Sequence, residues 1–184
     1  MQRGIVPAFV KEVEKVFGGM TVGGGTDPSA SLGPLMSERG VQKVESHIKQ
    51  AQSLGAKIEW QAPSDYLKKE FSSGYFYPPT ILTGLTPKMD IWTEETFGPL
   101  AAIAVFDTEE EALALANDST VGLGAYLFTN NLSRAWRVAE EIETGMVRRH
   151  RFLVLNSVLT ISRRMYRSLS ITVCSVPQRL PSAA

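Results

Sequence analysis

Apolar residues recur at helical spacing in three stretches of the chain, and each stretch predicts an amphipathic helix. The first runs from Ile5 to Phe17, the second from about Glu38 to Leu54, and the third begins at a cap formed by Asn130 or Asn131. Gly145 is placed to end the third helix. Within this third helix four residues are expected to face inward: Leu132, Ala135, Ala139 and Ile142.

Strand patterns alternate with helices in the second half of the chain. The stretch "LAAIAVF", Leu100 to Phe106, is a near-continuous apolar run, which is typical of a strand buried on both faces. Thr108 and Glu111 then form a capping box for a short helix, and "AYLFT" beyond it predicts another strand. This alternation predicts βαβ units with a mainly parallel sheet, and therefore an α/β class.

The first half contains two weaker strand patterns. "AKIEW" predicts a short strand after the second helix. "YFYPPTIL", Tyr75 to Leu82, has strand-forming residues, but its two prolines lack the N–H donors of a sheet ladder. We therefore expect Tyr75 to Leu82 to form an edge strand or an irregular one.

The pattern of helices and strands breaks off at Val147, inside the expected start of a strand. From Arg148 to Ala184 the chain has seven arginines, no acidic residue, no glycine and no sustained apolar period. Subtracting these seven from 19 basic residues leaves 12 against 19 acidic ones, so the preceding part has a net charge of −7. The sequence predicts an α/β body over 1–147, followed by an unrelated, irregular and poorly ordered basic tail over 148–184.

The overall composition is that of an ordinary globular protein, with 43% hydrophobic and 21% charged residues in 184. The single cysteine, Cys174, can form neither an intramolecular disulfide nor a metal-ligand cluster, which favours a cytoplasmic location and no metal site. No apolar run approaches the roughly 20 residues of a membrane span.

Three features invite functional interpretations but fit simpler ones better. Gly23-Gly24-Gly25 lacks the Gly-Lys-Ser/Thr ending of a Walker loop and the strand-then-helix context of a dinucleotide fingerprint, so it is predicted to be a surface turn. His47 has no partner at metal-ligand spacing and is predicted to be a partly exposed helix residue. The arginines of the tail accompany no nucleic-acid motif, so no specific nucleic-acid partner is expected.

The stretch "TEETFGPLAAIAVF" carries the strongest candidate site. Glu95 stands two residues before Phe97, at a Gly-Pro corner that leads into a predicted strand. Such a carboxylate could be a solvated turn residue, or it could hold a polar ligand beside an aromatic ring. From the residues alone both interpretations stay open.

Several motifs in the second half resemble the aldehyde dehydrogenase superfamily, and most of all its succinate-semialdehyde dehydrogenases. They are Glu-Glu-Thr-Phe-Gly-Pro, Asp-Thr-Glu-Glu-Glu-Ala, Ala-Asn-Asp, Gly-Leu-Gly-Ala-Tyr and Arg-Val-Ala-Glu-x-Ile-Glu-x-Gly-Met-Val. Upstream, "VGGGTDPSASLGPLMSERG" and "GYFYPPTIL" are also similar to that family. The resemblance covers about Gln2 to Val147 and implies a partial aldehyde dehydrogenase catalytic domain.

The resemblance implies roles for two residues of the corner. In this family the Glu of Glu-x-Phe-Gly-Pro accepts hydrogen bonds from the nicotinamide-side ribose of NAD or NADP, and the Phe packs nearby. These roles fall on Glu95 and Phe97. A carboxylate suits ribose hydroxyls because it only accepts hydrogen bonds and they can donate them.

The resemblance also implies that an aldehyde, such as succinate semialdehyde, is oxidised to its carboxylate by a Cys nucleophile and a Glu general base. Both lie upstream of the matched segment in family members, and Cys174 matches no family cysteine, so no catalytic residue is assigned and the chain alone is expected to be inactive. As the family assembles as dimers or tetramers, a non-catalytic partner of full-length subunits is the alternative. A mitochondrial location is the alternative to a cytoplasmic one if a transit peptide is missing upstream.

Overall fold

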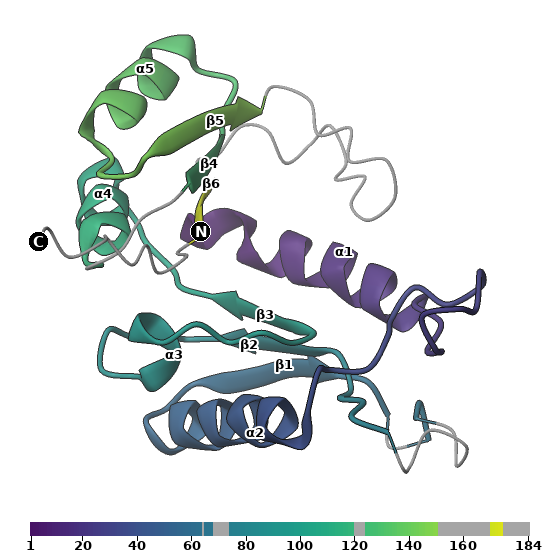
Figure 1. Ribbon diagram of the computed structural model, residues 1–184. Helices are drawn as coiled ribbons and strands as arrows, with labels where there is room; N and C mark the ends of the chain where they lie inside the picture. Colours follow the sequence, from purple (N-terminus) through teal and green to yellow (C-terminus); the bar gives the residue numbers. More distant parts are fainter. Residues whose placement is uncertain (64, 68–73, 120–123, 151–169, 175–184) are drawn as a thin grey trace, which may run out of the picture. The chain divides into compact units, whose positions relative to one another are not determined.

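The computed structural model describes residues 1–63, 65–67, 74–119, 124–150 and 170–174, as Figure 1 shows. The chain divides into two compact units. One spans Pro7–Ala104, and the other combines Met1–Val6 with Val105–Ala184. The candidate corner lies in the first unit.

The unit Pro7–Ala104 is built on a three-stranded sheet with the strand order β1-β2-β3. The central strand β2 pairs antiparallel with β1 and parallel with β3. The elements of this unit are α1 (Val6–Gly18, of which Val6 belongs to the other unit), α2 (Glu38–Ser53), β1 (Lys57–Gln61), β2 (Thr80–Thr83), α3 (Asp90–Thr93) and β3 (Leu100–Ile103).

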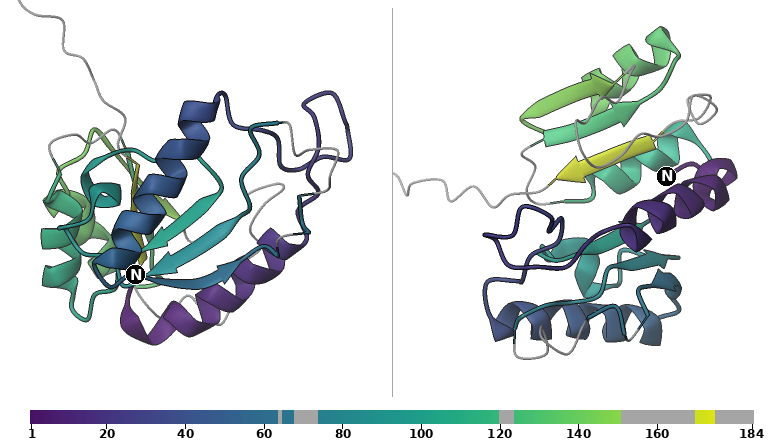
Figure 2. Two further views of the ribbon diagram at one scale, coloured as in Figure 1. Left: turned by 90° about the horizontal axis from the view of Figure 1, so that it is seen from below. Right: turned by 90° about the vertical axis from the view of Figure 1, so that its right-hand side faces the viewer.

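The sheet lies between α1 and α2 in the views of Figures 1 and 2. A register shift in β1 directs Ile58 toward α2 and Trp60 toward α1. Ile58 pairs with Leu82, but Trp60 pairs with the adjacent Ile81, so one residue of β1 is left over. Ile58 then packs with the α2 core, while the Trp60 ring lies 6.2 Å from the ring of Phe17 on α1. Without the shift, Ile58 and Trp60 would share one face of the strand.

Two predictions for these strands were wrong in their details. Tyr75 to Leu82 was expected to form an edge strand or an irregular one; residues 75–79 are irregular, but β2, which begins at Thr80, is the central strand of the sheet with all four residues buried. The two prolines do not interrupt the hydrogen bonds of β2, because both precede Thr80. The carbonyl of Pro79 accepts a hydrogen bond from the N–H of Ala62. The predicted strand from Leu100 to Phe106 ends at Ile103, and Ala102 within it is exposed.

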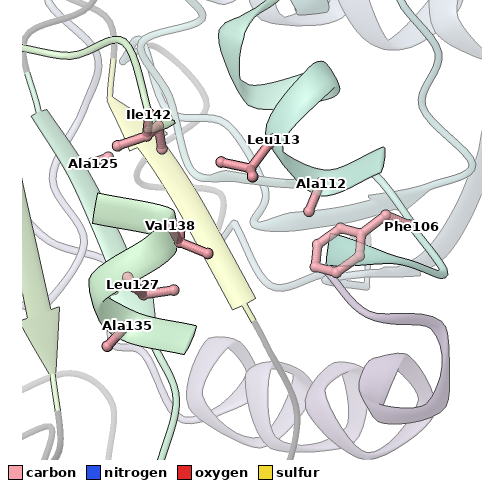
Figure 3. Packing of buried hydrophobic residues seen from close by; sticks show 8 residues of the cluster. All are labelled: Phe106, Ala112, Leu113, Ala125, Leu127, Ala135, Val138 and Ile142. Carbon is pink, nitrogen blue, oxygen red and sulfur yellow. The ribbon is translucent and has the colours of Figure 1, made fainter. Parts of the chain in front are cut away.

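The second unit has a sheet with the order β5-β4-β6, in which β4 is parallel to β5 and antiparallel to β6. Figure 3 shows its core, where side chains of α4 and α5 meet those of β4 and Phe106. The connection from β4 through α5 to β5 confirms a predicted βαβ unit. The elements are η1 (Arg3–Ile5), α4 (Glu109–Asn117), β4 (Gly124–Phe128), α5 (Leu132–Glu141), β5 (Met146–His150) and β6 (Ser170–Cys174).

The predicted helix caps of this unit are confirmed. Thr108 accepts a hydrogen bond from the N–H of Glu111, and Asn131, rather than Asn130, caps α5 by accepting from the N–H of Arg134. The predicted inward face of α5 was partly wrong, since Leu132 and Ala139 are exposed. The buried residues are Ala135 and Val138 on α5 and Ile142 directly after it.

Two strands reach into the predicted tail. β5 begins at Met146, as expected for a strand after Gly145, and β6 was not predicted. The remainder of the tail, residues 151–169 and 175–184, lies outside the described residues. Its poor order and the boundary at Val147 therefore stay predictions.

Candidate functional site

The corner from Glu94 to Pro99 joins α3 to β3. Glu94 closes α3 with an extended backbone (φ −106°, ψ 134°). At the other end, the carbonyl of Pro99 accepts a hydrogen bond of 2.9 Å from the N–H of Thr80 at the start of β2. The corner is thereby fixed to the central strand of the sheet.

Alternate residues of the corner contact the helix α2. The Glu94 carboxylate lies 3.1 Å from Lys43 Nζ and 3.5 Å from His47 Nε2. The hydroxyl of Thr96 lies 2.7 Å from His47 Nδ1. Because Lys43 and His47 are four residues apart, they stand on one side of the helix and meet the corner together.

Gly98 continues this alternation by close approach to the same helix. A Cβ built on Gly98 would lie 2.6 Å from Val44 Cγ2, a separation that real Cβ atoms essentially never show. Val44 is fully buried, so it has little room to give way. A glycine at position 98 lets the backbone of the corner rest against α2.

Glu95 and Phe97 occupy the intervening positions. Neither side chain has a hydrogen bond or ion pair with α2 within the described residues. Glu95 is half-buried, and its carboxylate has no hydrogen bond or ion pair within the described residues. Phe97 is 75% exposed. An acceptor without a partner and an exposed ring thus lie two residues apart in the corner, and the ligand contact implied by the resemblance stays a prediction.

The two carboxylates of the corner have different surroundings. The hydrogen bond and charge of Lys43 lower the pKa of Glu94, with a smaller contribution from His47. Glu94 is therefore held as an anion that is paired with the helix. The carboxylate of Glu95 is left available for other donors.

His47 corrects a prediction. It was expected to be a partly exposed helix residue, but it is 4% exposed and contacts the corner through both ring nitrogens. The sequence held a signal for its burial, because His47 stands three residues after Val44 and four before Ala51, two buried residues of α2. Its partners could not be found this way, since Thr96 lies 49 residues further along the chain.

The glycine-rich segment matches its simpler interpretation as a turn. Residues 24–27 form a turn in which the carbonyl of Gly24 accepts a hydrogen bond from the N–H of Asp27. Asp27 in turn accepts hydrogen bonds from the backbone and hydroxyl of Ser29. Among the described residues, no group of three or more His, Cys, Asp or Glu could hold a metal ion.

Comparison with known proteins gives the family of this fold. The model of the aldehyde dehydrogenase family matches residues 1–159. The chain belongs to the aldehyde dehydrogenase family. This match runs past Val147, where the resemblance found from the sequence ended.

Three relatives illustrate the relationship. A succinate-semialdehyde dehydrogenase of Schizosaccharomyces pombe, named for NADP(+), is 45% identical over 80% of this chain and 29% of its own length. A Rattus norvegicus succinate-semialdehyde dehydrogenase, named as mitochondrial, is 42% identical over 80% and 27%. The crystal structure of a Streptococcus pyogenes succinic semialdehyde dehydrogenase with NADP+ superposes with a TM-score of 0.70 at 35% identity, over 80% of this chain and 31% of the other.

These relatives establish the α/β fold of the aldehyde dehydrogenases for this chain. The chain spans less than a third of the length of the curated relatives it matches. Its single cysteine, Cys174, lies outside the residues that match the family. No helix in the described part of the chain is long and apolar enough to cross a membrane.

Proposed function

We propose that the chain is a segment of an NAD(P)-dependent aldehyde dehydrogenase that oxidises an aldehyde such as succinate semialdehyde to its carboxylate. The segment supplies the corner at which Glu95 accepts hydrogen bonds from the nicotinamide-side ribose and Phe97 packs beside it. The observation that carries this proposal is the alternation of the corner. Glu94, Thr96 and Gly98 contact α2, whereas the Glu95 carboxylate has no partner among the described residues and the Phe97 ring is exposed.

The residues present fit the cofactor chemically. Ribose hydroxyls donate hydrogen bonds, and the half-buried carboxylate of Glu95 is an acceptor with no partner among the described residues. The exposed ring of Phe97 offers an apolar wall beside it. When bound, the nicotinamide supplies the hydride acceptor, and the part of this segment is to orient the ribose that carries it.

We infer further that the 184-residue chain has no dehydrogenase activity by itself. Family chemistry needs a cysteine nucleophile, and residues 1–159, which match the family, contain none. The assay is oxidation of succinate semialdehyde by the purified chain with NAD or NADP. Turnover that survives Cys174→Ser would contradict this inference.

The cofactor role is tested by placing this segment in a full-length relative. In a hybrid enzyme, the matching segment of the Schizosaccharomyces pombe relative is replaced by residues 1–147 of this chain. We expect the hybrid to oxidise succinate semialdehyde with NADP, NAD or both, and the ratio of the two rates shows the preferred cofactor. A folded hybrid that turns over neither would refute the proposed function.

A second candidate, a non-catalytic partner of full-length subunits, is favoured by one surface feature. Leu132 and Trp136 are 63% and 68% exposed and stand four residues apart on α5, so they form one apolar patch. Co-expression with a full-length homologue should give co-elution that Trp136→Ala abolishes. Met36→Ala, at a methionine that is 97% exposed, is the control. Failure of the unsubstituted chain to co-elute removes this candidate.

For the compartment we propose the cytoplasm, with mitochondria as the alternative because a similar protein carries that name. Cell fractionation of the natural protein decides between the two. Recovery in the mitochondrial fraction would overturn the cytoplasmic assignment.

A further inference from the structure

His47 is a buried polar residue that the proposed cofactor contact does not itself use. Its ring is enclosed between α2 and the corner, with Nδ1 2.7 Å from Thr96 Oγ1 and Nε2 3.5 Å from Glu94 Oε2. When a buried imidazole ring has a partner at each nitrogen, its orientation and its tautomer are more restricted than those of a solvated ring.

The chemistry of the partners selects one form of the ring. A neutral imidazole has one N–H donor and one lone pair, a carboxylate can only accept, and a hydroxyl can donate. The proton therefore belongs on Nε2, facing Glu94, and Nδ1 accepts the hydrogen bond of the Thr96 hydroxyl. The opposite tautomer would turn a lone pair toward the Glu94 carboxylate.

We propose that His47, in this Nε2–H form, is a positioning residue for the cofactor corner. By holding Glu94 and Thr96 against α2, it fixes the corner in the arrangement that leaves the Glu95 carboxylate without a partner and the Phe97 ring exposed. The inference rests on the proposed role of Glu95 and Phe97 and adds the helix residue that orients them.

Lys43 does not replace His47 in this role. Its ion pair with Glu94 is exposed on both sides, at 42% and 58% of the side chains, and such pairs contribute little and are screened by salt. Within the described residues, Lys43 also makes no hydrogen bond with Thr96. The buried contact with Thr96 is made by His47.

The first test reads the tautomer directly in the intact, unsubstituted chain. With ¹⁵N-labelled histidine at mildly alkaline pH, nitrogen–proton correlation spectra should give a non-protonated signal for Nδ1 of His47 and a protonated one for Nε2. The chain has two histidines, so a His150→Gln variant assigns the signals. Any other protonation pattern at His47 overturns the proposal.

The second test asks whether His47 orders the corner selectively. A glutamate-specific protease is used without cofactor on the full chain, and cleavage after Glu94 and Glu95 is compared with cleavage after Glu14 on α1. His47→Phe keeps an aromatic ring, somewhat larger than imidazole, but removes both nitrogens. We expect cleavage at the corner to be about tenfold faster in this variant, with little change at Glu14. The reason is that loss of a buried hydrogen bond raises, by about this factor, the fraction of molecules in which the corner is open to the protease.

Two further variants separate positioning from general destabilisation. Ile48→Val removes a buried methylene from the same turn of α2 and should not favour the corner over Glu14. Thr96→Val should open the corner as His47→Phe does, and the double variant should be no worse than either. Equal acceleration at the corner and at Glu14 in His47→Phe, or additive effects in the double variant, would overturn the proposal.

The outcomes are distinguishable from failure of the proposed function because both tests omit the cofactor. If the corner opens selectively but Glu95→Gln leaves the hybrid enzyme unchanged, the cofactor role is wrong and the contact between His47 and the corner stands. If Glu95→Gln impairs the hybrid enzyme but His47→Phe leaves the corner closed, the positioning role of His47 is wrong.

Discussion

Replacing Gly98 by alanine is expected to destabilise the unit Pro7–Ala104, because the new methyl group would lie 2.6 Å from Val44 Cγ2. Overpacking of this kind costs about 1–3 kcal/mol. Alanine also restricts the unfolded chain, which offsets about 0.4–1 kcal/mol. Gly98 is not among the glycines with positive φ, so no backbone strain adds to the cost. The net loss in free energy of unfolding is therefore about 0–2.6 kcal/mol, with a central value of about 1.3 kcal/mol.

Urea unfolding followed by tryptophan fluorescence measures this loss, since Trp60 and Trp92 lie in the same unit. The midpoint should fall by about 0.5–1 M with an unchanged slope. Gly24→Ala is the matched control, because a Cβ at Gly24 would meet nothing within 4 Å.

A double variant tests the cause of the loss. Val44→Ala removes the methyl groups that the new Cβ would meet, so Gly98→Ala should cost less in that background, with a coupling energy of about 0.5–3 kcal/mol. The reasoning is refuted if Gly98→Ala is as stable as Gly24→Ala. It is also refuted if the effects of Gly98→Ala and Val44→Ala are additive.

Two further predictions concern the other unit. The guanidinium groups of Arg137 and Arg134 lower the pKa of Glu109, so the stability that its carboxylate contributes is present above the ordinary range of Glu and is lost as pH falls through the lowered value. Glu109→Gln should thus cost about 1 kcal/mol at neutral pH and progressively less in acid, and a pH-independent difference in urea unfolding would contradict this. Asn131→Ala should cost about 1 kcal/mol in thermal unfolding by removing the cap of α5, and an equal cost for the neighbouring Asn130→Ala would refute the capping role.

Local rules predicted α1, α2, α4 and α5, although α5 ends at Glu141 rather than at Gly145, and the short α3 was not predicted. The caps at Thr108 and Asn131 use backbone groups only three residues away, so their sequence signals are complete in themselves. The strand that follows Gly145 was predicted because a strand is expected after the helix in a βαβ pattern.

Long-range pairing limited the remaining predictions. The central place of β2 depends on partners on both sides, β1 upstream and β3 downstream, which no local pattern specifies. β6 pairs with β4, which lies far upstream, and the apolar residues from Arg148 onward keep no sustained period. The burial of Ala135, Val138 and Ile142 on α5, rather than of Leu132, likewise depends on how the helix rests on β4.

For the candidate site, the resemblance to the family suggested Glu95 and Phe97 but could not give their surroundings. The contacts that the neighbouring Glu94 and Thr96 make with α2 join residues far apart in the sequence. His47 was assigned to the helix surface because its partners are remote in sequence. Its position between Val44 and Ala51 is the signal that would have placed it inside.

The central claim, that Glu95 holds the nicotinamide-side ribose, is tested most directly by steady-state kinetics of the hybrid enzyme with Glu95→Gln. Hydrogen bonds to a charged group contribute about 1.5–3 kcal/mol, so kcat/KM for the cofactor should fall by about 10- to 100-fold. Glu14→Gln, the same change at an exposed position on α1, should leave it unaltered. Equal kinetics for the Glu95→Gln and Glu14→Gln hybrids would contradict the account.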